Sequence, residues 1–251
     1  MTAPKTYSEQ KLSAEDRLII ALDVESADAA RDVIKELDGV GATFKIGLQL
    51  FTAGGPALVD ELVSRGVRVF LDLKFHDIPN TVAKAGIEAA RLGVWMFNVH
   101  AAGGSEMMKR TVGETAAFCE ASNRPRPLII GVTVLTSSAS ETLRETSVEK
   151  NVKDQVSVLS RLVSQAGLDG VVASAEEIGI IRAAVPVAGF RIVTPGIRPE
   201  NGTNDDQKRV MTPGAAILAG ADHLVIGRPI LHATDRRAAA EKLLNEIREA
   251  C

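Results

Sequence analysis

A short charged segment is the most informative feature of the chain. The run FLDLKFHDIPNT (residues 70–81) carries Asp72, Lys74 and Asp77 directly after an apolar stretch. Residues i and i+2 of a strand share a face and lie about 6.6 Å apart, so Asp72 and Lys74 project together. A carboxylate beside an ammonium group at the end of a buried strand is suited to proton transfer and electrostatic catalysis.

An ordinary surface ion pair gives the same pattern and contributes only about 0 to 1 kcal/mol to stability. Two flanking features favour chemistry over that alternative. Asp77 adds a second carboxylate, and Ile78 and Pro79 open a new helix with proline in its first turn. A strand, a short charged loop and a helix form the arrangement in which α/β enzymes place catalytic residues.

The elements around this segment repeat one pattern, an apolar strand followed by an amphipathic helix. The predicted strands are 18–23, 43–46, 67–73, 96–99, 128–133, 170–172, 191–193 and 223–226. The predicted helices are 26–37, 56–65, 81–92, 106–120, 152–165, 176–183, 213–219 and 236–247. Eight such units in about 230 residues favour an α/β fold with a single closed (β/α)8 TIM barrel over an open doubly wound sheet.

One catalytic barrel domain is expected over residues 17–251, because no linker rich in Pro, Gly or Ser divides the chain. Residues 1–16 are polar, lack the apolar core of a signal peptide, and are predicted to form a loose tail or a short helix. Long polar connections at 135–150 and 195–210 interrupt the pattern, and loops of this length are usually functional or disordered.

Composition and charge disfavour several classes of partner. The formal net charge is −3, with 29 basic and 32 acidic residues mixed along the chain, so polyanions are not attracted overall. One Trp, one Tyr and seven Phe provide no platform for stacking bases. No stretch approaches 18 continuous apolar residues. We therefore predict no nucleic-acid partner, no membrane partner and a cytoplasmic location.

The active site of a TIM barrel forms at the C-terminal ends of its strands. Polar residues at the predicted ends are expected to face one cavity: Asp23, Lys45, Asp72 with Lys74, His100, Thr136, Ser174, Arg198 and Arg228. Each has an ordinary explanation when taken alone, such as a helix cap for Asp23 or a backbone-bonded core residue for His100. Two lysines and two aspartates at three adjacent strand ends are harder to explain in that way.

The segments TPGIRP and VIGRPI, after the last two strands, have the composition of a phosphate site. Their glycines allow close backbone approach, and Arg198 and Arg228 supply bidentate donors. TIM barrels commonly bind phosphate at this location, so a phosphorylated small molecule is the predicted ligand. The sequence offers no His/Cys cluster and no carboxylate set free of neighbouring lysines, so we predict no metal and no cofactor.

With these motifs the chain resembles the orotidine 5′-phosphate decarboxylase family in its bacterial form. The resemblance covers roughly residues 17–232, and its motifs are ALDV at Asp23, FKIG at Lys45, DLKFHDIPNT, VTVLTS at Thr136, TPGIRP at Arg198 and IGRPI at Gly227 and Arg228. It implies a cofactor-free carboxy-lyase that converts orotidine 5′-phosphate to UMP in de novo pyrimidine biosynthesis.

The resemblance also implies roles for single residues. Lys74 would protonate C6 of the pyrimidine as carbon dioxide leaves, with Asp72 beside the departing carboxylate. Lys45 would join Asp23 on the ribose hydroxyls and complete the charged row. Base, phosphate and other substrate contacts are implied for Thr136, Arg198, Gln207, Gly227, Arg228 and Ile78.

The resemblance further implies a homodimer in which Asp77 and Thr81 of one subunit enter the site of the other. Residues 198–209, rich in Gly, Asn and Asp, are the candidate lid over the phosphate. Because the phosphate lies far from C6, its binding energy would act by driving closure of that lid.

Two other interpretations stay open. The same Asp-x-Lys-x-x-Asp pattern resembles 3-keto-L-gulonate 6-phosphate decarboxylase, a magnesium-dependent enzyme family with glutamate where Lys45 stands here. A non-catalytic barrel that senses a phosphorylated metabolite would need only the phosphate site. The presence of Asp72, Lys74 and Asp77 together argues against such a decayed site.

Overall fold

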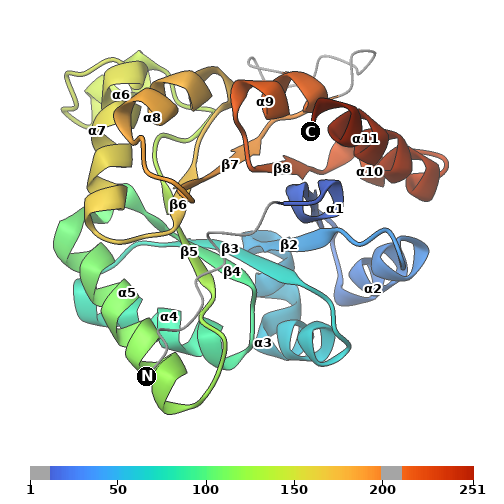
Figure 1. The fold of residues 1–251 in the computed structure, drawn as a ribbon. Coiled ribbons are helices and arrows are strands. Elements are labelled where there is room, and N and C mark those ends of the chain that lie inside the picture. The colour runs from blue at the N-terminus through green and yellow to red at the C-terminus, as the bar shows by residue number, and fades with distance from the viewer. Residues whose placement is uncertain (1–11, 199–210) are drawn as a thin grey trace.

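A computed structural model describes residues 12–198 and 211–251. Within these ranges the strands form one closed barrel in which each strand pairs in parallel with the next and β8 pairs with β1 (Figure 1). The strands are β1 (Leu18–Ala21), β2 (Thr43–Gly47), β3 (Val69–Phe75), β4 (Met96–His100), β5 (Leu128–Val132), β6 (Gly170–Val172), β7 (Arg191–Pro195) and β8 (His223–Ile226). The predicted (β/α)8 barrel is confirmed.

Helices surround the barrel on its outside (Figure 1). They are α1 (Ala14–Arg17), α2 (Ala27–Glu36), α3 (Leu48–Ser64), α4 (Pro79–Arg91), α5 (Gly104–Ala121), α6 (Ser140–Glu145), α7 (Val152–Gln165), α8 (Ile178–Ala184), α9 (Pro213–Ala219), α10 (Arg228–Leu231) and α11 (Arg236–Ala250), with 3-10 turns η2 (Ala101–Gly103) and η3 (Ala175–Glu177). Side chains of Ser26, Asn151, Thr212 and Asp235 accept hydrogen bonds from the first turns of α2, α7, α9 and α11. Such caps satisfy backbone N–H groups that have no partner within the helix.

Several elements extend the predicted ones or add to them. Helix α3 starts at Leu48, eight residues before the predicted start, because it contains a break at Gly55 (φ 64°) and the pattern identified only the part after Pro56. The last residues of the predicted tail form α1, whose buried Ala14 and Ser13 cap attach it to the barrel. The long connection after β5 includes α6, and α10 begins directly after β8.

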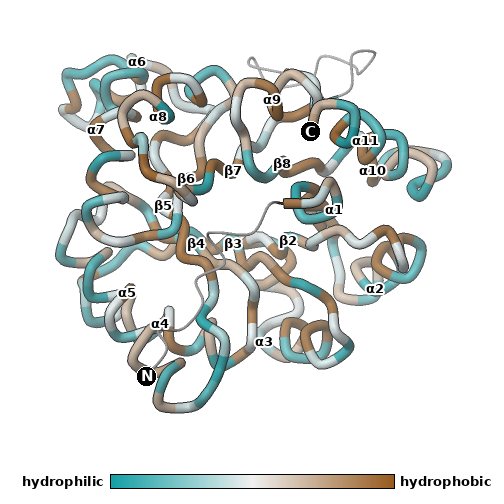
Figure 2. Tube along the Cα trace, in the orientation of Figure 1, coloured by the Kyte–Doolittle hydropathy of each residue, from teal (hydrophilic) through white to brown (hydrophobic). Residues whose placement is uncertain are grey.

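Apolar side chains fill two separate layers. The larger layer lies between the strands and the helices and includes Val69 and Leu71 of β3. The smaller layer lies inside the barrel and consists of Ile19, Phe70, Met96, Leu128, Ile130 and Val193. Because side chains of a strand alternate between faces, Phe70 lies on the same side as Asp72. Figure 2 shows the hydrophobic colouring of strands such as β8 against the mixed colouring of the outer helices.

The N-terminal end of the barrel is held by aspartates that precede two strands. Asp169, before β6, accepts a hydrogen bond from the backbone N–H of Ile129 at 2.7 Å, and Asp222, before β8, accepts one from Ile192 at 2.7 Å. Their arginine partners are Arg126 for Asp169, and Arg182 and Arg191 for Asp222. These pairs join neighbouring strands at the end opposite the predicted active site, where TIM barrels place residues that serve stability.

His223 lies fully buried at the same end. Its Nδ1 donates to the backbone carbonyl of Asp16 at 2.9 Å, and its ring meets that of Trp95 edge-on with centroids 5.3 Å apart. Burial lowers the pKa of His223 to about 4, although the carboxylate of Asp222 opposes the shift. The imidazole is therefore neutral in the folded protein near pH 7 and ties the short helix α1 to the barrel.

Candidate active site

One cavity of about 270 Å³ opens at the C-terminal ends of the strands. It brings together eight of the residues predicted from the sequence: Asp23, Lys45, Asp72, Lys74, Thr136, Arg198, Gly227 and Arg228. Apolar residues such as Phe70 and Val132 form the rest of its wall. The cavity is therefore a mostly apolar hollow with a few polar groups that converge, as small-molecule sites usually are.

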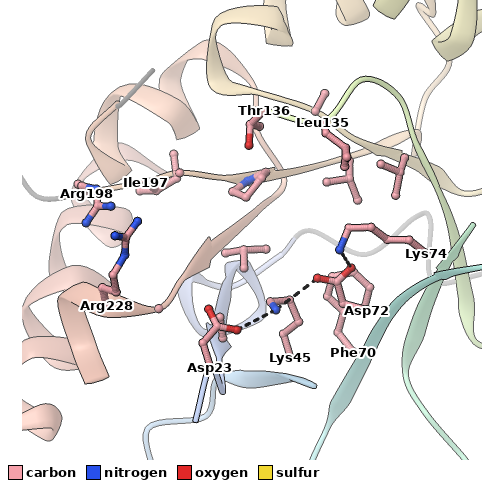
Figure 3. Close-up of a pocket in the computed structure, with 18 of the residues that line it drawn as sticks. Asp23, Lys45, Phe70, Asp72, Lys74, Leu135, Thr136, Ile197, Arg198 and Arg228 are labelled. Carbon is pink, nitrogen blue, oxygen red and sulfur yellow. Dashed lines mark hydrogen bonds and ion pairs between the residues drawn. The ribbon is translucent and has the colours of Figure 1, made fainter. Parts of the chain in front are cut away.

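Asp23, just after β1, forms an alternating row of charges along one side of this cavity with Lys45 of β2 and with Asp72 and Lys74 of β3 (Figure 3). The Nζ atom of Lys45 lies 3.4 Å from Oδ1 of Asp23 and 3.3 Å from Oδ2 of Asp72. The Nζ atom of Lys74 lies 2.7 Å from Oδ1 of Asp72. Carboxylate and ammonium groups alternate from β1 to β3, and each ammonium group contacts at least one carboxylate.

Asp72 is the most enclosed carboxylate of the row, with a side chain only 13% exposed. Burial alone would raise the pKa of Asp72, but the charges of Lys45 and Lys74 outweigh it, and hydrogen bonds from Lys74 and Asn98 act in the same direction. The pKa of Asp72 consequently lies below its usual value. The carboxylate stays ionised beside the ammonium of Lys74 at neutral pH.

Asn98 is a site residue that the sequence interpretation missed. Its side chain is buried in β4 and donates from Nδ2 to Oδ1 of Asp72 at 2.7 Å. The sequence does contain a signal for it, an amide in the middle of the apolar strand MFNVH. A buried polar side chain requires a hydrogen-bond partner, so an asparagine there indicates a specific contact.

Arginines provide the positive charge at the end of the cavity away from Lys74. Figure 3 shows the guanidinium groups of Arg198 and Arg228 near each other there, with Thr136 on the wall opposite Asp23. The absence of a side chain at Gly227 lets the backbone there lie close to Asp23, because a Cβ would be only 3.3 Å from Oδ2 of Asp23. The cavity thus combines an arginine end with a row of alternating charges.

The three predicted residues at the start of α4 do not enter the cavity of their own chain. Asp77 and Thr81 are exposed, and Ile78 is 65% exposed. Oδ1 of Asp77 accepts a hydrogen bond from the backbone N–H of Ile78 at 2.6 Å. Gln207 and most of the candidate lid 198–209 lie outside the residues that the structure describes.

Two other predicted strand-end residues lie beside the cavity without lining it. His100 is half-buried and packs against His76, with ring centroids 5.4 Å apart. Burial lowers the pKa of His100, and the charges of His76 and Lys74 lower it further. Ser174 is buried, and its backbone N–H donates to Oε2 of Glu177, the last residue of η3. The expectation that both face the cavity was wrong.

Residues 12–198 and 211–251 contain neither a cluster of metal-ligating side chains nor a membrane-spanning helix. No group of three or more His, Cys, Asp or Glu side chains is placed there to hold a metal ion. No helix in the same ranges is long and apolar enough to cross a bilayer.

Known proteins match this chain over most of its length. A relative from Syntrophotalea carbinolica, named orotidine 5′-phosphate decarboxylase, is 51% identical over 239 residues, which is 95% of this chain and 98% of the relative. One of the same name from Moorella thermoacetica is 50% identical and covers 94% of each chain. The crystal structure of orotidine 5′-phosphate decarboxylase from Lactobacillus acidophilus superposes with a TM-score of 0.82 at 34% identity, covering 92% of this chain and 99% of that one. Residues 16–243 match the model of the orotidine 5′-phosphate decarboxylase / HUMPS family, and the chain belongs to that family.

Proposed function

We infer that this protein decarboxylates orotidine 5′-phosphate to UMP in de novo pyrimidine biosynthesis. The observation that carries this proposal is the pair of Lys74 and Asp72, 2.7 Å apart, in a cavity whose other end holds Arg198 and Arg228. The names of the relatives at about 50% identity support the same activity. The enzyme is a carboxy-lyase that uses no metal or cofactor in this proposal.

The chemistry requires a nearby cation and a nearby proton. Loss of carbon dioxide from C6 leaves an electron pair in the plane of the pyrimidine ring, where the ring π-system cannot delocalise it. Electrostatic stabilisation and prompt protonation must therefore replace an electron sink. Lys74 provides both, because its ammonium group is a positive charge and a proton donor, and it pairs with the carboxylate of Asp72.

Asp72 acts on the bound substrate as well as on Lys74. Its carboxylate would lie beside the substrate carboxylate that departs as carbon dioxide. Two like charges 4 Å apart at an effective dielectric of 20 repel by about 4 kcal/mol, and this repulsion is relieved when carbon dioxide leaves. Lys45 lies 3.3 Å from Asp72 and keeps the row electrically balanced before the substrate binds.

The remaining lining residues bind the rest of the nucleotide. Arg198 and Arg228, with the backbone at Gly227, hold the phosphate, since guanidinium groups bind phosphate oxygens in pairs. Asp23 and Lys45 bind the ribose hydroxyls, and Thr136 contacts the pyrimidine edge together with Gln207. In this order the pyrimidine would lie towards Lys74 and the phosphate towards the arginines, which are at opposite ends of the cavity (Figure 3).

A homodimer completes each site in this proposal. Asp77 and Thr81 are exposed at the start of α4, where Ile78 presents a 65% exposed apolar side chain. A second hollow of about 190 Å³ borders Lys45 and Lys74 on the side of Leu48, whose side chain is 59% exposed. Residues of a partner subunit entering this hollow would bring Asp77 next to the charged row and cover both apolar side chains. We also propose a cytoplasmic location, which agrees with a role in nucleotide biosynthesis.

Incubation of the purified protein with orotidine 5′-phosphate tests the activity, with ultraviolet absorbance as the measurement. We expect conversion to UMP at the same rate with and without a chelator. Absence of UMP would refute the decarboxylase and leave a non-catalytic phosphometabolite barrel. Loss of turnover on chelation would instead favour a metal-dependent enzyme of the 3-keto-L-gulonate 6-phosphate decarboxylase type. Neither alternative is favoured by the relatives, and the ammonium of Lys45 holds the place where that family carries a glutamate.

A further inference from the structure

The amide side chain of Asn98 connects the two residues at the reacting end of the cavity. Its Nδ2 atom donates to Oδ1 of Asp72 at 2.7 Å, and its Oδ1 atom accepts from the backbone N–H of Lys74 at 2.8 Å. Asn98 is 1% exposed and does not line the cavity. A buried amide that uses both its donor and its acceptor on neighbours of the substrate site fixes the positions of those neighbours.

The strand pairing explains why an amide is needed at this position. Leu71 pairs with Phe97, but the next pair joins Phe75 to Val99, so four residue steps on β3 face two steps on β4. Asn98 lies opposite this irregular stretch. A bulge leaves backbone groups of the longer strand without ladder partners, and the side chain of Asn98 supplies one for the N–H of Lys74.

The backbone of Lys74 adopts a conformation that needs such support. Its φ of 52° lies in the left-handed region, which residues other than glycine rarely occupy. The bond from the Lys74 N–H to Asn98 holds the backbone in this conformation. The ammonium group then turns back onto Asp72, which lies only two residues earlier.

The same amide also decides how Asp72 is oriented. Oδ1 of Asp72 accepts two hydrogen bonds, from Nζ of Lys74 and from Nδ2 of Asn98. Its other oxygen, Oδ2, faces Nζ of Lys45. Because the amide is neutral, it orients the carboxylate without adding a charge to the row.

We propose that Asn98 is a positioning residue for decarboxylation, which holds the carboxylate of Asp72 and the backbone of Lys74 in the arrangement that the reaction uses. This inference rests on the proposed function, and Asn98 itself touches no substrate. Its loss therefore affects kcat, with little change in KM. A displacement of about 1 Å of catalytic groups costs about 100-fold in rate, which sets the scale of the effect.

Two variants separate positioning from simple packing. Asn98→Leu removes both hydrogen bonds. Asn98→Asp keeps the shape and the acceptor for Lys74, but it replaces the donor with a second carboxyl group against Asp72. Two carboxyl groups in contact do not both ionise readily, so the acidic limb of the kcat profile of Asn98→Asp moves to higher pH. Thr43→Val is the matched control, because Thr43 is fully buried in β2 and its Oγ1 has no hydrogen-bond partner among the residues of the described ranges.

We expect kcat to fall about 100-fold in Asn98→Leu with KM within about threefold of wild type, while Thr43→Val keeps the wild-type kcat. The proposal is overturned if Asn98→Asp has the wild-type kcat and acidic limb, or if the variants change only KM. The near-isosteric Asn98→Asp decides the question if Asn98→Leu does not fold.

A second measurement does not depend on activity. The Lys74 amide should exchange with deuterium more slowly in wild type than in Asn98→Leu, and equal exchange would contradict the proposed role. If the wild-type protein forms no UMP, the proposed function fails while the exchange measurement still tests Asn98.

Discussion

The Nζ atom of Lys74 lies 2.7 Å from Oδ1 of Asp72, although the two residues are only two positions apart on β3. Side chains so placed on a regular strand would run parallel. The left-handed backbone of Lys74 and the irregular pairing of β3 with β4 bring the ammonium group back onto the carboxylate. A strained backbone at a residue that would donate a proton is typical of functional sites.

Replacement of Lys74 by alanine is predicted to abolish turnover while the protein remains folded. The side chain is 28% exposed and belongs to no apolar layer, so its removal should leave the barrel intact. Loss of both the general acid and the nearby cation should lower kcat by at least about 1,000-fold. Steady-state kinetics and circular dichroism check this, with Lys242→Ala on the exposed surface of α11 as the control. Activity comparable to wild type would show that Lys74 is not the proton donor.

Replacement of Arg228 by alanine is predicted to discriminate between substrates with and without a phosphate. We expect kcat/KM for orotidine 5′-phosphate to fall by about 10- to 100-fold, as for the loss of a charged hydrogen bond. The much slower turnover of orotidine should change by less than about threefold, because orotidine has no phosphate to lose contact with. The exposed Arg161→Ala of α7 serves as the control. Equal losses for the two substrates would exclude Arg228 from phosphate binding.

A mixed dimer tests whether Asp77 serves the neighbouring subunit. Lys74→Ala and Asp77→Ala chains, each expected to be inactive alone, are co-expressed with different tags and purified as the mixed dimer. If sites are shared, one of the two sites has both residues intact, so roughly half of the wild-type activity returns. If Asp77 acts within its own chain, both sites stay damaged and no activity returns.

The charged row was predictable because it follows from strand periodicity and strand order. Asp23, Lys45 and Asp72 each end an apolar strand, and the ends of three consecutive barrel strands must be neighbours. The contacts of Asn98 could not be predicted in the same way. Its partner is the backbone of Lys74, which becomes available only through the irregular pairing of β3 with β4. The alternation of side chains along a strand assumes regular pairing with its neighbour, so it does not reveal where that pairing becomes irregular.

Two general rules of sequence interpretation do not hold at particular places in this protein. Polar residues that end barrel strands face the cavity as a rule, but His100 packs on His76 and Ser174 caps η3. Helix α3 was predicted from Pro56 because glycine and proline normally separate elements. Here Gly55 lies within the element and only interrupts it.

Stability is predicted to fall in acid partly because of His223. Its pKa is about 4 in the folded protein and about 6.5 in an unfolded chain, so the unfolded state binds more protons below neutral pH. This contribution is complete above about pH 6.5 and is lost as the pH falls towards 4, at a cost of about 3 kcal/mol. Urea denaturation at pH 7 and at pH 4 measures the loss in wild type and in His223→Gln.

The glutamine variant should lose less stability over this pH interval than wild type does. Its amide can still donate to the carbonyl of Asp16 but does not titrate. His232→Gln, at an exposed position, is the control and should behave as wild type. An identical loss in His223→Gln and wild type would show that other groups cause the acid sensitivity.

The spacing of residues along β3 determines how this protein tolerates insertions and deletions. Arg68, which pairs with Asp16 and packs on Trp95, is followed at intervals of two by Phe70 of the inner layer and Asp72 of the charged row. Insertion or deletion of one residue between Arg68 and Asp72 would turn part of this set to the opposite face of the strand. A substitution at one of these positions changes only the contacts of that residue. An insertion or deletion of one residue would displace Arg68, Phe70 and Asp72 relative to one another. The number of residues between Arg68 and Asp72 is therefore expected to be fixed, whereas surface loops tolerate changes in length.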